Sequence, residues 1–361
     1  MNLHSILTAS ALLSFTSLMS QDMKMNQTQV IGSHNSYKSG IEKPLMDMIL
    51  ADRPEASALD YAHIPMIEQL DLGLRSLEID VLYDPEGGRF AHPKGLEMLA
   101  AQGIEARSYN ADAMNAPGFK VLHIPDIDFR SHCPTFKACL YDIKAWSKAH
   151  SDHLPIVITI NPKTSGPDKP GFAKVLPFDK TVLDALDKEI RDVFKQDELI
   201  TPALVKGKQK TLRDAIIDKG WPQLAKVKGK ILFVLDADKD LTTVYVAGDD
   251  DYARPMFANT TADNPHAAFL LRNDPIKQEK EITELVKQGF MIRTRSDADT
   301  REARTGDKTR FDAAIRSGAQ VITTDYYLKS LSPNKDFEIT LHGAYSQCNP
   351  VLVKSSACTL K

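Results

Sequence analysis

The sequence lacks the features that mark several common classes of protein. Its formal net charge is −3 and it has no dense block of lysine or arginine, so nothing in it indicates a nucleic-acid partner. It has only 4 cysteines and no Cys-x-x-Cys pair, which argues against a structural zinc site. No internal repeat or low-complexity segment stands out. A chain of 361 residues is an ordinary size for a single α/β barrel.

The first twenty residues differ in character from the rest of the chain. Residues 6–19 are apolar with small and hydroxylated side chains, and His4 is the only basic side chain before them. This length suits a secretory signal better than a membrane span. The sequence therefore predicts a signal peptide over residues 1–20 and a secreted or periplasmic protein. An uncleaved anchor and a buried N-terminal helix are the alternatives.

Export bears on the cysteines, because exported chains commonly form disulfides. Cys133 lies close to Cys139 in the sequence, and Cys348 lies close to Cys358. An even number of cysteines fits two disulfides, and local pairing is the simplest of the three possible connectivities. Four reduced thiols are the alternative.

Three apolar runs end in, or contain, residues that coordinate metals or move protons. The first run leads to His34 and Asn35, the second contains Glu78 and Asp80, and the third ends at His123. The two acids are at i and i+2, so they share one face of a strand. Two histidines with a set of hard oxygen ligands suit metal-assisted phosphoryl transfer.

The order of apolar runs predicts a (β/α)8 TIM barrel. Strands are expected near residues 30, 78, 121, 157, 232, 269, 291 and 322, and helices separate most of them. Candidate functional residues recur just after the strands, where the active sites of such barrels lie. A doubly wound sheet is the alternative, but no glycine-rich phosphate loop follows the first strand. We expect the barrel over residues 21–332 and a short tail over residues 333–361, packed on or near it.

The two acids give the strongest chemical signal. Carboxylates within an apolar strand carry a desolvation cost unless they are paired or bound to a metal. Salt bridges from Glu78 and Asp80 to Arg75 or Lys120 are the alternative to metal ligation, which we favour because Asn35 is expected nearby. Oxygen ligands point to calcium or magnesium, with calcium preferred.

The two histidines and the residues at later strand ends complete the predicted site. His34 and His123 are the candidate proton-transfer pair, although a lone histidine at a strand end is usually structural. Asp128 is interpreted as a surface turn residue. Four further residues follow strands four, seven and eight: Lys163, Arg293, Arg295 and Asp325. The basic groups can hold a phosphate and the aspartate can orient one of them, whereas ordinary salt bridges are the alternative.

These motifs together resemble a known family. The chain resembles the secreted bacterial calcium-dependent phosphatidylinositol-specific phospholipases C in His34-Asn35-Ser36-Tyr37, Glu78-Ile79-Asp80 and His123-Ile124-Pro125-Asp126. The likeness extends to Cys348-Asn349-Pro350, so it covers nearly all of the mature chain. It implies a distorted TIM barrel in which the inositol 2-hydroxyl attacks the neighbouring phosphorus. Diacylglycerol and a cyclic inositol phosphate would be the products.

The resemblance also implies roles for individual residues. It makes His34 and His123 the catalytic pair and adds a calcium ion held by Asn35, Glu78 and Asp80. The family often has a further acidic ligand at the end of strand four, where this sequence has Asn161, with Lys163 two residues later. The lost negative charge predicts weaker calcium binding, or a share of the phosphate contacts for the lysine.

Two other functions stay open at this point. A glycerophosphodiester phosphodiesterase shares the barrel and the Glu-x-Asp pair, and it would act on soluble phosphodiesters. A catalytically weak phospholipid- or sugar-phosphate-binding barrel is the second alternative, and Asn161 favours it. The expected partner is a phospholipid or another phosphodiester, with peripheral membrane contact through the long excursion at residues 92–118. That excursion lacks a dense aromatic or basic cluster.

Overall fold

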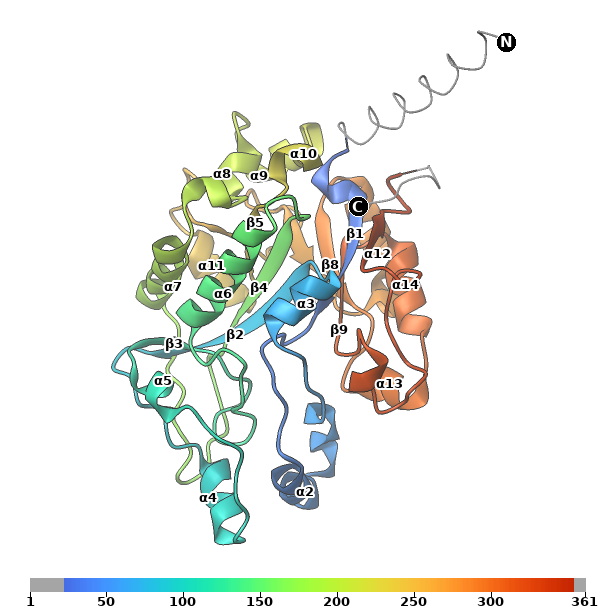
Figure 1. Ribbon diagram of the computed structural model, residues 1–361. Helices are drawn as coiled ribbons and strands as arrows, with labels where there is room; N and C mark the ends of the chain where they lie inside the picture. The colour runs from blue at the N-terminus through green and yellow to red at the C-terminus, as the bar shows by residue number, and fades with distance from the viewer. Residues whose placement is uncertain (1–22, 354–361) are drawn as a thin grey trace, which may run out of the picture.

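Eight parallel strands form a nearly closed barrel in the computed structural model, which describes residues 23–353 (Figure 1). Neighbouring strands pair in the order β6-β5-β4-β2-β1-β9-β8-β7. Their bounds are β1 (Thr28–Ser33), β2 (Ser76–Asp84), β4 (Ile156–Pro162), β5 (Ile231–Leu235), β6 (Met256–Ala258), β7 (Phe269–Leu271), β8 (Met291–Arg295) and β9 (Val321–Thr324). The two end strands meet where the Leu271 N–H donates to Asn259 Oδ1 at 2.9 Å. The predicted TIM barrel is therefore confirmed.

The third predicted strand does not belong to the barrel. The run near residue 121 forms β3 (Gly118–Lys120), which pairs antiparallel with the far end of β2, Phe119 opposite Tyr83. The missing barrel strand is β6, whose apolar run is only three residues long, between Pro255 and Asn259, whereas the run of the equally short β7 extends over residues 267–271. As a result His123 lies in the loop after β3 rather than at the end of a barrel strand.

Helices cover the outside of the barrel, as Figure 1 shows. The longer ones are α3 (Met66–Leu72), α6 (Phe136–Ala149), α7 (Lys180–Val193), α9 (Leu212–Asp218), α11 (Lys239–Val246), α12 (Pro275–Lys287) and α14 (Thr309–Ser317). The shorter ones are α8 (Pro202–Lys206), α10 (Leu224–Val227) and α13 (Arg301–Thr305). Several start at a capping threonine or aspartate, such as Thr135 before α6 and Asp179 before α7, whose side chains accept backbone N–H groups.

Along each strand, successive side chains point alternately toward the surrounding helices and toward the barrel interior. In β2, Leu77 and Ile79 are fully buried in the cluster that also contains residues of α6 and α7. Glu78 and Asp80 therefore face the interior. The pairing register with β4 sets Asp80 beside Asn161.

Two excursions project beyond the carboxyl ends of the strands, at the lower end of Figure 1. The first carries α2 (Lys43–Asp52), and the second carries α4 (Lys94–Ala101) and α5 (Ala111–Asn115). Leu45 and Ile49 of α2 pack with Leu99 and Phe129 of the second excursion, so the two excursions support each other.

The last part of the described chain, up to residue 353, packs on the barrel. Phe337, Ile339 and Leu341 are buried, and β10 (Ser346–Cys348) pairs antiparallel with β1. The predicted Cys133–Cys139 disulfide is present. The predicted signal peptide and Cys358 lie outside the described residues. Within residues 23–353, no helix has both the length and the apolar character needed to cross a membrane.

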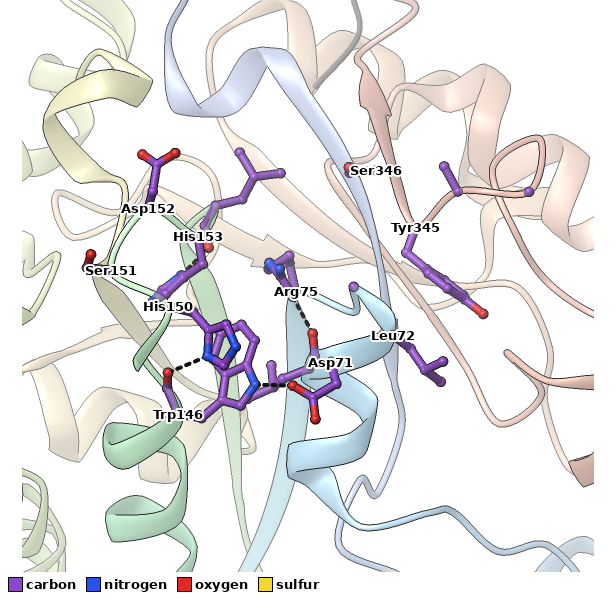
Figure 2. Close-up of a pocket in the computed structure, with 15 residues that line it drawn as sticks. Asp71, Leu72, Arg75, Trp146, His150, Ser151, Asp152, His153, Tyr345 and Ser346 are labelled. Atoms are coloured by element: carbon purple, nitrogen blue, oxygen red, sulfur yellow. Dashed lines mark hydrogen bonds between the residues drawn. The ribbon is translucent and has the colours of Figure 1, made fainter. Parts of the chain in front are cut away.

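A cavity of about 670 Å³ lies at the opposite, amino end of the strands (Figure 2). The Arg75 guanidinium lies 5.1 Å from the centre of the Trp146 ring, and Trp146 Nε1–H donates to Asp71 at 2.6 Å. Because the active sites of TIM barrels form at the other end, this cavity does not mark the predicted site.

Close packing of β1 against β2 generates a stability prediction. A Cβ added at Gly32 would lie 2.4 Å from Ser76 Cβ and 2.6 Å from Ser76 O. Gly32→Ala should therefore lower the free energy of unfolding by about 1–3 kcal/mol, measured by chemical denaturation. Ser76→Gly should relieve part of this loss in the double variant. An unfolding midpoint for Gly32→Ala equal to that of the wild type would contradict the prediction.

Candidate active site

The structure brings most of the predicted site residues to the carboxyl ends of the barrel strands. His34 and Asn35 follow β1, Glu78 and Asp80 lie in β2, Asn161 lies in β4 with Lys163 directly after it, Arg293 and Arg295 lie in β8, and Asp325 follows β9. Only His123, of the ten residues predicted, reaches this end from a loop outside the barrel.

His34 is held by a carboxylate on one side and faces a second one on the other. Its Nδ1–H donates to Asp325 Oδ1 at 3.0 Å, and its Nε2 lies 4.0 Å from Glu78 Oε1. Burial and the charge of Arg295 lower the pKa of His34, while Asp325 and Glu78 oppose that shift. A carboxylate on Nδ1 fixes the tautomer and leaves Nε2 free to exchange a proton.

Asp325 is a buried, charged anchor for this histidine. Burial alone would raise the pKa of Asp325, but His34, His63 and Arg295 outweigh burial and hold it well below its usual range. His63 Nε2–H donates to the His34 carbonyl at 2.7 Å and lies 3.6 Å from Asp325 Oδ1. Sequence reasoning missed His63, because no pattern around it signals a contact with a strand end.

Asn35 adopts a left-handed backbone conformation with φ of 50°, which asparagine tolerates better than most residues. Its side-chain Nδ2–H donates to the Tyr61 hydroxyl at 2.7 Å. This bond orients the amide so that Oδ1 remains available to a ligand.

The two acids of β2 each lie beside a cation. Arg293 Nη2–H donates to Glu78 Oε2, and although burial would raise the pKa of Glu78, Arg293 and the other nearby cations lower it. Lys163 Nζ lies 2.7 Å from Asp80 Oδ2. The alternative partners named above are wrong: Arg75 donates to backbone carbonyls and Lys120 pairs with Asp84.

His123 belongs to a second histidine–carboxylate pair. Its Nδ1–H donates to Asp128 Oδ2 at 2.7 Å, and Lys38 Nζ lies 2.9 Å from the other oxygen. Burial would raise the pKa of Asp128, but Lys38 and His123 lower it instead. Asp128 is 1% exposed, so its interpretation as a surface turn residue is wrong. Lys38 Nζ also lies 4.7 Å from the Tyr61 ring centre.

Tyr61 connects the two histidine–carboxylate pairs. Its ring stacks on His34 with 6.0 Å between ring centroids, and it also contacts Lys38, the cation that holds Asp128. The two pairs are therefore linked through Tyr61 and Lys38. Neither Tyr61 nor Lys38 was predicted, because their contacts with His34 and Asp128 form only when the fold brings distant loops together.

An additional acid, Asp236, lies directly after β5 at the same end of the barrel. Burial raises the pKa of Asp236 to about 6, with Glu78 and Asp80 adding to the rise while Arg293 and Lys163 oppose it. The sequence could have pointed to it, since an acid after an apolar run is the same pattern that identified the other site residues.

The side chains at this end of the barrel include oxygen ligands of the type that calcium binds. Glu78, Asp80, Asn35 and Asn161 offer carboxylate and amide oxygens, the ligands that calcium prefers. Asp80 Oδ1 has no hydrogen-bond partner among the described residues, although the side chain is fully buried. Such an oxygen has capacity for a cation. As placed, no three His, Cys, Asp or Glu side chains within residues 23–353 lie close enough together to hold an ion.

Comparison with known proteins agrees with this geometry. Residues 23–350 match the family described as phosphoinositide phospholipase C, Ca2+-dependent. The barrel fold and the family match together define the class of this protein as a barrel phosphodiesterase. The chain belongs to the Ca2+-dependent phosphoinositide phospholipase C family, which confirms the predicted family and enzyme class. A search of curated proteins found no match.

Solved structures show the same fold at low sequence identity. A calcium-dependent phosphoinositol-specific phospholipase C from the Gram-negative bacterium Pseudomonas sp., described as an apo form and myoinositol complex, is 15% identical, with a TM-score of 0.56 over 92% of this chain and 97% of that one. The Ca2+-dependent phosphatidylinositol-specific phospholipase C from Streptomyces antibioticus is 17% identical, with a TM-score of 0.53 over 87% of this chain and 98% of that one.

The His34–Asp325 contact generates a prediction about turnover of phosphatidylinositol. Asp325→Asn should lower kcat by roughly 10²–10⁴-fold, because an amide no longer stabilises the Nδ1–H tautomer or the charged imidazole. Steady-state kinetics measure the loss, and thermal unfolding checks that the variant is folded. Asp336→Asn, which changes an exposed acid, should leave kcat within a factor of two. Equal kcat for Asp325→Asn and the wild type would contradict the role of this contact.

Proposed function

We propose that this protein cleaves phosphatidylinositol by intramolecular transfer, releasing diacylglycerol and forming a cyclic inositol phosphate. The observation that carries the proposal is the pair of histidine–carboxylate contacts at one end of the barrel. His34 and His123 each give Nδ1–H to a buried aspartate, which leaves both Nε2 atoms for the substrate. Two such groups suit a reaction in which one imidazole gives a proton to the leaving group and the other stabilises charge on the phosphoryl oxygens.

In the proposed step, the inositol 2-hydroxyl oxygen forms a bond to phosphorus while the bond from phosphorus to the glycerol oxygen breaks. A carboxylate of β2, Glu78 or Asp80, accepts the hydroxyl proton. One histidine gives a proton to the departing alkoxide, and the other stabilises charge on the phosphoryl oxygens.

Basic residues at the barrel mouth would bind the phosphate. Arg295 Nη2 lies 3.5 Å from Asp325 Oδ2, so the aspartate orients this guanidinium as well as His34. Arg293 and Lys163 are paired with Glu78 and Asp80, and they can share their donors with a phosphate oxygen.

We propose calcium as the cofactor. Asn35, Glu78, Asp80 and Asn161 would hold it through side-chain oxygens. When bound, the ion would lower the pKa of the attacking hydroxyl and offset charge on the phosphate oxygens.

Export and membrane contact are further parts of the proposal. The Cys133–Cys139 disulfide supports an oxidising location outside the cytosol. Phospholipid would reach the site from the end of the barrel that carries α2 and α4, so peripheral contact with a membrane is expected there.

A binding barrel with little catalysis is the second candidate. The observation in its favour is that Arg293 and Lys163 already neutralise the two acids of β2. It predicts tight phosphate or headgroup binding without turnover, so product analysis separates the two functions.

Phosphorus NMR of the products tests the proposal. Incubation of phosphatidylinositol with the protein and calcium should give the resonance of a cyclic inositol phosphate, and excess chelator should abolish it, because the metal offsets charge that the residues alone do not. Absence of any product with calcium present would favour the binding barrel, whereas a non-cyclic product throughout would favour a glycerophosphodiesterase.

Matched histidine variants serve as controls for the same measurement. His34→Ala and His123→Ala should each lower product formation by more than about 10²-fold. His150→Ala alters an exposed histidine at the opposite end of the barrel (Figure 2) and should leave it within a factor of two.

A further inference from the structure

Asp236 extends the polar lining of the barrel mouth by one strand. Its backbone N–H donates to the Ile160 carbonyl at 2.8 Å, so the parallel pairing of β5 with β4 continues one residue beyond Leu235. The carboxylate is therefore fixed at a strand end rather than carried on a loop.

The strand register sets three polar side chains in one layer. Asp80 is opposite Asn161 across β2 and β4. Thr159 is opposite Val234 across β4 and β5, which makes Asn161 and Asp236 neighbours two residues further along. Residues between these positions pack outward under the helices. The side chains of Asp80, Asn161 and Asp236 consequently share the inner face of three adjacent strands.

Each acid of this layer has at least one carboxylate oxygen without a hydrogen-bond donor. Among residues 23–353, no side chain lies within ion-pair distance of the Asp236 carboxylate and no group donates a hydrogen bond to it. It lines a cavity of about 240 Å³ together with Asn161 and Thr164. On the other side of Asn161, Asp80 is fully buried and its Oδ1 has no hydrogen-bond partner in the described part of the chain. Carboxylate oxygens left unpaired at a buried or partly buried position have capacity for a cation.

We propose that Asp236 is a ligand of the cation site, where it supplies a third carboxylate beside Glu78 and Asp80. The inference rests on the proposed function in taking calcium as the ion. Asn161 contributes an oxygen but no charge, and calcium affinity rises with the number of charged ligands. The three acids are not close enough as placed to hold an ion together, so binding draws their side chains inward by rotation. Lys163, which lies 2.7 Å from Asp80 and is 23% exposed, moves aside as the ion binds.

Calorimetric titration of the mature, full-length protein with calcium chloride tests the assignment. Asp236→Asn should weaken the calcium Kd by at least about tenfold, because one charged ligand is lost while the shape is kept. Asp240→Asn is the matched control. It removes the same charge four residues later, from an exposed position in the first turn of α11 that does not line the cavity shared by Asp236 and Asn161. Its Kd should stay within a factor of two of the wild type.

A compensating variant distinguishes the loss of a calcium ligand from a general destabilisation of the site. Asn161→Asp adds a carboxylate to the same layer, so Asp236→Asn/Asn161→Asp should recover much of the lost affinity. Thermal unfolding without calcium should show that each variant is folded. An unchanged Kd for Asp236→Asn, an equal loss in Asp240→Asn, or no calcium binding by the wild type would each overturn the assignment.

Product analysis separates this inference from the proposed reaction. With saturating calcium, Asp236→Asn should regain formation of the cyclic phosphate, whereas His34→Ala should not. If the wild type binds calcium in an Asp236-dependent way but forms no cyclic phosphate, the proposed reaction fails and the ligand assignment stands.

Discussion

Charge balance inside the mouth of the barrel is the constraint on which the site depends. Glu78 is 3% exposed and Asp80 is fully buried, and a carboxylate in such a place is costly unless opposite charge lies close. Arg293 and Lys163 supply that charge from strands that are distant in the sequence. The interior thus carries acids and bases together, which is what binding a phosphodiester and moving its protons requires.

The same constraint explains the two histidine–carboxylate contacts. Asp325 is buried and ionised beside His34, and Asp128 is buried and ionised beside His123 with Lys38 as a second partner. Each carboxylate fixes one imidazole nitrogen, so the other faces the substrate with a defined role. A barrel strand end supplies the first histidine, and a loop braced by α2 and α4 supplies the second.

The sequence was sufficient for the barrel and for residues that end strong apolar runs. His34 and Asp325 could be found because each follows a strong apolar run, and Glu78 and Arg293 because each is a charged side chain within such a run. Strand β6 could not be found, since its apolar run stops after three residues. The run near residue 121 was therefore counted as a barrel strand, and the position of His123 in a loop was missed. Lys38 and Asp128 lie 90 residues apart, so their pairing depends on tertiary folding that no local pattern reports.

The measurement that tests the central claim most directly uses a phosphatidylinositol analogue lacking the inositol 2-hydroxyl. The buried acids and histidines of this site are proposed to drive attack by that hydroxyl, so the analogue should bind with an affinity near that of the natural lipid and release no diacylglycerol. Release at the rate seen with phosphatidylinositol would contradict intramolecular attack, and water would then have to be the nucleophile.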